Sequence, residues 1–190
     1  MDGEVGIYVC GITPYSPSHI GHARQAIAFD IIVRWLRDSG YKVNHITNFT
    51  DIDDKIIAIA NDEEVDFLEV ANRNIEDYFE VMNLLNVLPA DAYPRVTETI
   101  PEIISMISRL ISSGNAYESL DGVYFEINSA PEKYGQLTGQ TLEMVQEGAG
   151  GRVNTTGSGK KNHRDFALWK FAKENEPYWD SPWGKGRPGW

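Results

Sequence analysis

Two hydrophobic periodicities alternate in the first part of the chain. Val5 to Cys10 is a β-branched and aromatic run that stops at Gly11, which predicts a buried strand running into a loop. From Ile20 the apolar residues recur every three or four positions, which predicts a largely buried helix ending near Gly40. Tyr41 to Thr47 predicts a second strand. A strand, a helix and a strand in this order predict a βαβ unit with parallel strands and a right-handed crossover.

Three helical segments follow the second predicted strand. Asn48 to Asp62 opens with polar residues and continues as a short helix, and Asp66 to Val87 repeats apolar residues on one helical face. The third helix starts at a capping box formed by Thr99 and Glu102 and ends at Gly114. We therefore expect a helical segment between the βαβ unit and the rest of the chain.

Short strand patterns replace helical ones after the third helix. Ala116 to Glu118 and Val123 to Ile127 are predicted strands. A Gly-rich loop runs from Gly148 to Lys161, and Phe166 to Phe171 is a further apolar run. We interpret residues 115–165 as a small β-rich insertion.

Composition narrows the class of protein. Hydrophobic residues make up 42% and charged residues 24% of the 190 residues, which is typical of a folded globular domain. The formal net charge of −11 argues against a broad basic surface that binds nucleic acid, so most of any RNA contact is expected elsewhere. A single cysteine, Cys10, excludes an internal disulfide, and no signal peptide or membrane-spanning run of about 20 apolar residues is visible. We expect a cytoplasmic protein that does not bind membranes.

The strongest chemical signal is the string from Ser18 to His22, where the loop gives way to the predicted helix. Free backbone N–H groups and the positive end of the helix dipole attract phosphate there. Gly21 permits close approach of a nucleotide to the backbone, and the imidazoles of His19 and His22 can donate to phosphoryl oxygens that gain charge in a transition state. The alternative is that His19 caps the helix and His22 packs within it.

The His-Ile-Gly-His string after a first strand resembles the signature of class I aminoacyl-tRNA synthetases. Further stretches resemble the cysteinyl-tRNA synthetases of that class, in order along the whole chain: Tyr8 to Thr13, Asn48 to Ile56, Arg164 to Lys170 and Ser181 to Trp190. The resemblance implies an α/β fold, a Rossmann-like nucleotide-binding half-domain with parallel strands and a small β-rich insertion. Residues 1–114 would form the first half of the catalytic domain with its helical segment. Residues 115–165 would form a connective insertion near the tRNA acceptor end, and residues 166–190 would return to the catalytic domain.

The resemblance also implies a reaction and a site. Cysteine would be activated with ATP and Mg²⁺ to cysteinyl-adenylate, and the cysteinyl group would be transferred to tRNA(Cys). The implied catalytic residues are His19 and His22. The implied ATP-binding residues, in the signature region Ile12 to His22, are Thr13, His19, Gly21 and His22. The implied cysteine-binding residues are Cys10, Gly11, Thr50 and Trp190, and Cys10 also matches the first ligand of the zinc ion that binds the substrate thiolate in this family.

The chain stops at Trp190, where the family continues with further segments. These hold the remaining zinc ligands, the Lys-Met-Ser-Lys-Ser loop and an anticodon-binding helical domain. We therefore expect an N-terminal fragment that ends before the second zinc ligand, with weak ATP affinity at best and negligible aminoacylation. A zinc site is not expected to form with one ligand of four. An uncovered edge of the parallel sheet would favour self-association.

Other interpretations remain open. The cysteine ligase of mycothiol synthesis has a motif similar to Gly11 to Tyr15, although Asp53 to Ile57 is more like the synthetase. A non-catalytic binding module derived from a synthetase is a further alternative.

Structural roles are also possible for the single residues to which the resemblance assigns a function. A lone cysteine at a strand end is usually a small buried apolar residue. Thr50 or Asp51 could cap the next helix, and we expect Asp51, Asp53 and Asp54 to complement its dipole rather than bind magnesium.

Overall fold

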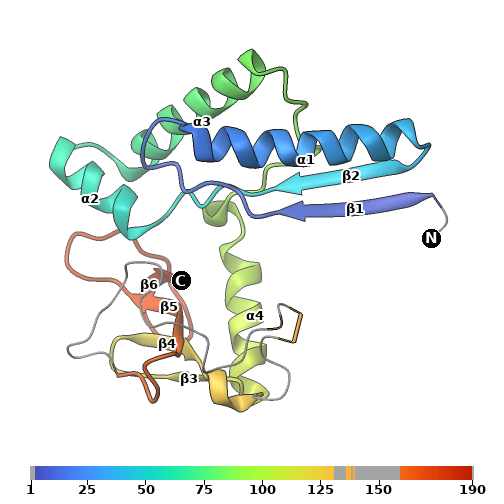
Figure 1. Ribbon diagram of the computed structural model, residues 1–190. Helices are drawn as coiled ribbons and strands as arrows, with labels where there is room; N and C mark the ends of the chain where they lie inside the picture. The colour runs from blue at the N-terminus through green and yellow to red at the C-terminus, as the bar shows by residue number, and fades with distance from the viewer. Residues whose placement is uncertain (1–2, 131–135, 138, 140–158, 190) are drawn as a thin grey trace. The chain divides into compact units, whose positions relative to one another are not determined.

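The computed structural model (Figure 1) describes residues 3–130, 136, 137, 139 and 159–189. The chain divides into two compact units, residues 1–99 and residues 100–190, each with its own sheet and its own core. No helix in the described part of the chain is long and apolar enough to cross a membrane. Most of the Gly-rich loop from Gly148 to Lys161 lies outside the described residues.

The first unit is built on a parallel pair of strands. Strand β1 (Glu4–Val9) pairs with β2 (Lys42–Thr47), and helix α1 (Ile20–Asp38) connects them and runs alongside (Figure 1). This confirms the predicted βαβ unit. Parallel bridges from Ile46 to Ala92 and from Phe49 to Arg95 add a further segment beside β2.

The exposure of α1 and β1 differs from the prediction. Only Ala23 and Val33 of α1 are buried, whereas the side chain of Trp35 is 65% exposed. Alternate residues of β1, among them Tyr8, are exposed as well. The predictions of a largely buried helix and a buried strand were therefore wrong for the described structure. A narrow stripe of α1 is enough to cover the described strands, so the rest of its apolar surface faces solvent.

Two helices complete the first unit. Helix α2 (Asp54–Glu63) begins after Asp53, whose carboxylate accepts a hydrogen bond from the backbone N–H of Lys55 (3.0 Å). Helix α3 (Phe67–Leu84) is capped in the same way by Asp66. The core of the unit is a cluster of buried apolar side chains that includes Ile12, Phe49, Ile75, Tyr78 and Met82.

Helix α2 also corrects a prediction about capping. Asp53 is its cap, and neither Thr50 nor Asp51 is. Asp51 is fully buried, and its carboxylate accepts hydrogen bonds from the backbone N–H (3.0 Å) and the hydroxyl (2.6 Å) of Thr97. Thr97 lies in the short 3₁₀ helix η1 (Val96–Glu98). Asp51 therefore ties the segment after β2 to η1.

The second unit is an antiparallel sheet with one long helix, α4 (Ile100–Ser112). The sheet order is β3 (Ala116–Glu118), β4 (Gly122–Phe125), β5 (Phe166–Phe171) and β6 (Gly186–Pro188). A short 3₁₀ helix, η2 (Ile127–Ser129), follows β4. The two predicted short strands are confirmed, and Phe166 to Phe171 is a third strand of the same sheet. The domain boundaries at residues 114 and 165 stay a prediction.

A buried carboxylate organises the second unit. Asp165 accepts hydrogen bonds from the Tyr117 hydroxyl (2.6 Å) and from the backbone N–H groups of Ile127 and Asn162 (both 3.0 Å). Burial and this carboxylate together raise the pKa of Tyr117 to about 12, which keeps its hydroxyl protonated as the donor. The unit is therefore held by a satisfied polar cluster as well as by its apolar core around Trp169.

Candidate functional site

The carboxyl ends of β1 and β2 bring two predicted site segments together. Val9 lies opposite Thr47 in the parallel register, so Cys10 and Gly11 follow one strand where the segment ending at Thr50 follows the other. The backbone N–H of Thr50 donates to the carbonyl oxygen of Ile12 (3.0 Å). In open α/β sheets ligands bind at this end of the strands. The side chain of Thr50 is buried here.

Gly11 is a glycine because of a close backbone approach. A Cβ atom at this position would overlap the backbone carbonyl oxygen of Asn48. The backbone N–H of Gly11 donates to the side-chain Oδ1 of Asn48 (2.9 Å). Only a residue without a side chain lets these two loops meet.

Cys10 is exposed, so the alternative of a buried apolar cysteine is wrong. Its backbone carbonyl accepts a hydrogen bond from Nε2 of Gln25 in α1 (2.8 Å), which places Cys10 beside the first turns of this helix. Within the described residues no group of three or more His, Cys, Asp or Glu side chains could hold a metal ion. The role of Cys10 as a zinc ligand, which the family resemblance implies, therefore stays a prediction.

The two histidines of the signature form the start of α1. His19 is the N-cap, and its Nδ1 accepts a hydrogen bond from the backbone N–H of Gly21 (3.0 Å). The Nδ1 of His22 accepts in turn from the backbone N–H of His19 (3.4 Å). The two rings stack with centroids 3.8 Å apart. The interpretation of His19 as a cap is confirmed, and a cap leaves the far side of the ring free for another role.

This geometry settles which ring nitrogen of each histidine is a donor. Because both Nδ1 atoms accept hydrogen bonds, the proton of each neutral ring lies on Nε2. Burial lowers the pKa of His22, the neighbouring His19 lowers it further, and Asp77 opposes both. His22 is therefore neutral at physiological pH and presents its Nε2–H as a donor.

Helix α3 fixes the approach to α1. The carboxylate of Asp77 accepts a hydrogen bond from the backbone N–H of Ser18 (2.7 Å), immediately before the two histidines. Gly21 faces the cap directly, since a Cβ there would lie 2.8 Å from Cε1 of His19. The histidine pair is thus held by its own cap, by α3 and by a glycine that leaves room for the ring.

Two predicted site residues lie outside these contacts. Thr13 is half-buried in the loop between β1 and α1, and its carbonyl oxygen accepts from the backbone N–H of Tyr15 (2.9 Å). Trp190 falls outside the described residues. The structure therefore brings the segments of Cys10 and Thr50 together and links Cys10 to α1, which begins after His19. The roles of all the predicted site residues, Trp190 included, stay predictions.

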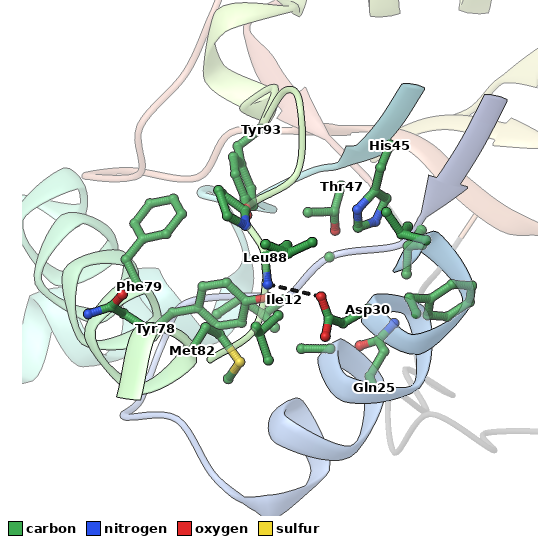
Figure 2. Close-up of a pocket in the computed structure, with 18 residues that line it drawn as sticks. Ile12, Gln25, Asp30, His45, Thr47, Tyr78, Phe79, Met82, Leu88 and Tyr93 are labelled. Atoms are coloured by element: carbon green, nitrogen blue, oxygen red, sulfur yellow. Dashed lines mark hydrogen bonds between the residues drawn. The ribbon is translucent and has the colours of Figure 1, made fainter. Parts of the chain in front are cut away.

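A cavity of about 200 Å³ lies within the first unit, between the end of β1 and the loop after it, α1, α3, the end of β2 and the segment before η1 (Figure 2). His45, Tyr78 and Tyr93 are among its lining residues, and Asp30 at its edge accepts from the backbone N–H of Leu88 (3.0 Å). Of the predicted site residues in the described chain, only Gly11 lines it. Sequence patterns missed this cavity because its walls come from segments that are far apart in the chain.

Comparison with known proteins identifies the family. All 190 residues match the family described as the catalytic domain of class I (C) tRNA synthetases. The chain belongs to this family. The cysteine–tRNA ligase of Pyrococcus furiosus is 55% identical over 189 residues, and that of Dehalococcoides mccartyi is 51% identical. The resemblance to cysteinyl-tRNA synthetases is therefore confirmed.

These relatives are longer than the chain. The alignment covers all of this chain but 39% of the P. furiosus protein and 40% of the D. mccartyi protein. The chain also resembles the solved methionyl-tRNA synthetase of Mycobacterium tuberculosis in complex with methionyl-adenylate. The TM-score is 0.54 and the sequence identity 24%, and the match covers 65% of this chain and 25% of that protein. This likeness confirms the Rossmann-like class I synthetase fold.

Proposed function

We propose that the chain is part of a cysteine–tRNA ligase and supplies residues that bind cysteine and ATP when the whole enzyme activates the amino acid. The family and its cysteine–tRNA ligase relatives support this. The observation that carries the proposal is the position of Cys10, whose carbonyl is bonded to Gln25 one helical turn after His22. Cys10 and the two histidines are thereby held near the same end of the parallel strands.

The nucleotide would lie at the N-terminus of α1. The proposed ATP-binding residues are Thr13, His19, Gly21 and His22. The carboxylate of cysteine attacks the α-phosphate of ATP and expels pyrophosphate, and negative charge grows on the phosphoryl oxygens. The Nε2–H groups of His19 and His22 and the positive end of α1 stabilise that charge, with Mg²⁺ as the counterion of the phosphates.

Cysteine would lie where β1 and β2 end. Cys10, Gly11 and Thr50 line this place in our proposal, together with Trp190. Zinc, which the family resemblance implies, would bind the substrate thiolate and favour it over a serine hydroxyl. Among the described residues, Cys10 is the zinc ligand that the resemblance implies.

The remaining partners follow from the same proposal. tRNA(Cys) would receive the cysteinyl group, and residues 115–165 would lie near its acceptor end. A net charge of −11 is consistent with most of the tRNA contact lying elsewhere. We also propose a cytoplasmic location, supported by the single unpaired cysteine, and self-association through the exposed apolar side chains of α1.

Cysteine-dependent ATP–pyrophosphate exchange tests this function. It should be measured on the full-length natural protein that contains this sequence and on the 190-residue chain, with serine as the control amino acid. We expect exchange with cysteine only, transfer to tRNA(Cys) by the full-length protein, and negligible activity of the 190-residue chain. Transfer of cysteine to an amino sugar rather than to tRNA would identify the mycothiol-pathway ligase instead. Absence of any cysteine-dependent exchange in the full-length protein would favour a non-catalytic module.

A further inference from the structure

Asn48 joins the two loops of the proposed cysteine site through one side-chain amide. Its Oδ1 accepts hydrogen bonds from the backbone N–H of Gly11 (2.9 Å) and from the hydroxyl of Tyr8 (3.0 Å). Its Nδ2 donates to Oγ1 of Thr50 (3.3 Å). Three residues on two segments of the first unit therefore share one amide group.

The orientation of this amide is determined by its partners. A backbone N–H can only donate, so the atom that faces Gly11 must be the oxygen of Asn48. The NH₂ group is then left to face Thr50, whose hydroxyl oxygen accepts. A hydroxyl that accepts from Asn48 still has its own hydrogen to donate. Thr50 is 1% exposed, which limits the other partners that this hydrogen can find.

The same amide fixes the backbone of Cys10. The peptide between Cys10 and Gly11 is held at its N–H by Asn48 (2.9 Å) and at its C=O by Gln25 (2.8 Å). Both polar groups of this peptide are thus satisfied by side chains from β2's end and from α1. Rotation of this peptide plane would break both hydrogen bonds.

We propose that Asn48 is a positioning residue for the amino-acid substrate: it sets Thr50 as a hydrogen-bond donor and holds the Cys10–Gly11 peptide in place. This inference rests on the proposed function, because it assigns a purpose to the geometry of that site. Asn48 does not touch the reacting atoms in our proposal. It acts through Thr50 and Cys10.

The decisive variant is Asn48→Asp. A carboxylate of the same shape still accepts from Gly11 but has no N–H for Thr50. The Thr50 hydroxyl would then donate to the carboxylate and would no longer be available to the substrate. Asn48→Ala removes all three bonds. Asn44→Asp makes the same chemical change at an exposed position of β2 and is the matched control.

Two measurements test separately the hydrogen bonds of Asn48 and their effect on cysteine binding. The first is amide hydrogen exchange at Gly11 by NMR in the 190-residue chain. Exchange should be about tenfold faster in Asn48→Ala and close to wild type in Asn48→Asp and Asn44→Asp. The second is ATP–pyrophosphate exchange by the full-length natural protein. In Asn48→Asp the KM for cysteine should rise about tenfold, while the KM for ATP and the midpoint of thermal unfolding stay near wild type.

Each outcome bears on a different statement. An active wild type with an unchanged cysteine KM in Asn48→Asp would overturn the role of Asn48 and leave the proposed function intact. An equal rise in the KM for cysteine and in the KM for ATP would show that Asn48 is merely structural. A wild-type protein without cysteine-dependent exchange would refute the proposed function and this inference with it. An unchanged rate of amide hydrogen exchange at Gly11 in Asn48→Ala would refute the proposed hold of Asn48 on the Cys10–Gly11 peptide.

Discussion

The imidazole ring of His19 stacks on the ring of His22, with centroids 3.8 Å apart and planes inclined by 24°. His19 uses its Nδ1 to cap α1 and keeps its Nε2–H for a ligand. The same ring therefore has a structural role at Nδ1 and a proposed catalytic role at Nε2. Substitution of His19 by asparagine or by glutamine, whose amide groups lie at different distances from the backbone, can separate the capping role from the proposed catalytic role.

We expect His19→Asn and His19→Gln to behave differently. Asparagine is a good N-cap but lacks a donor at the Nε2 position, so the stability of the chain should be kept while kcat of ATP–pyrophosphate exchange by the full-length protein falls about 100-fold. Glutamine places its NH₂ near the Nε2 position but caps poorly, so it should retain more activity and lose stability. Urea unfolding and exchange kinetics give the two readouts. The reverse order of activities would show that the cap alone matters.

Gly11→Ala should destabilise the first unit by more than about 2 kcal/mol, because the added methyl group would overlap the carbonyl oxygen of Asn48 and push the two loops apart. Gly6→Ala in β1 is the matched control, since a Cβ there meets nothing within 4 Å. The control should change stability by less than about 1 kcal/mol. The free energy of unfolding in urea is the measurement. Equal effects of the two substitutions would contradict the close approach.

The stability of the chain should decrease below about pH 6.5, in part because of His45. Burial lowers the pKa of His45, and Arg37 lowers it too, against the opposing effect of Asp91 and Asp30. The folded state then binds fewer protons than the unfolded state at low pH. The contribution of His45 is fully present above the unfolded pKa and is lost as the pH falls.

His45→Gln removes this titration. We expect the unfolding free energy of this variant to fall less between pH 7.5 and pH 5.5 than that of wild type. His163→Gln, at an exposed histidine of the second unit, is the control for loss of an imidazole. An identical pH dependence in wild type and His45→Gln would rule out a contribution from His45.

The exposed face of α1 should make the 190-residue chain self-associate. Ile31 and Trp35 are 61% and 65% exposed, and both lie on this face of the helix. Ile31→Lys and Trp35→Lys should shift the chain toward monomer in sedimentation velocity at increasing concentration. Asn61→Lys, on the exposed side of α2, adds the same charge without removing apolar surface. A wild-type chain that stays monomeric at high concentration would contradict the prediction.

Local patterns predicted the elements of the first unit well. The strand before Gly11, the helix from Ile20 and the next strand were found within one or two residues of their expected ends. Each depends on periodicity and capping among near neighbours in the chain. Burial was predicted poorly, as α1 shows, because exposure depends on what else packs against a helix. The cap of α2 shows the same limit: three acidic residues lie close together, and only the folded backbone decided that Asp53 caps and Asp51 binds Thr97.

The sequence alone determined the family and the position of the proposed site, because the histidine signature and the segments from Tyr8 and from Asn48 are recognisable as strings of residues. The tertiary structure decided how these strings meet. Asn48 reaches Gly11 across 37 positions of sequence, and Ser18 meets Asp77 across 59. Such contacts depend on the parallel pairing of β1 with β2 and on the packing of α3, and no local preference encodes them. That long-range geometry alone determines which group donates and which accepts in each hydrogen bond. It therefore also determines which N–H or O–H of a side chain remains available to a ligand.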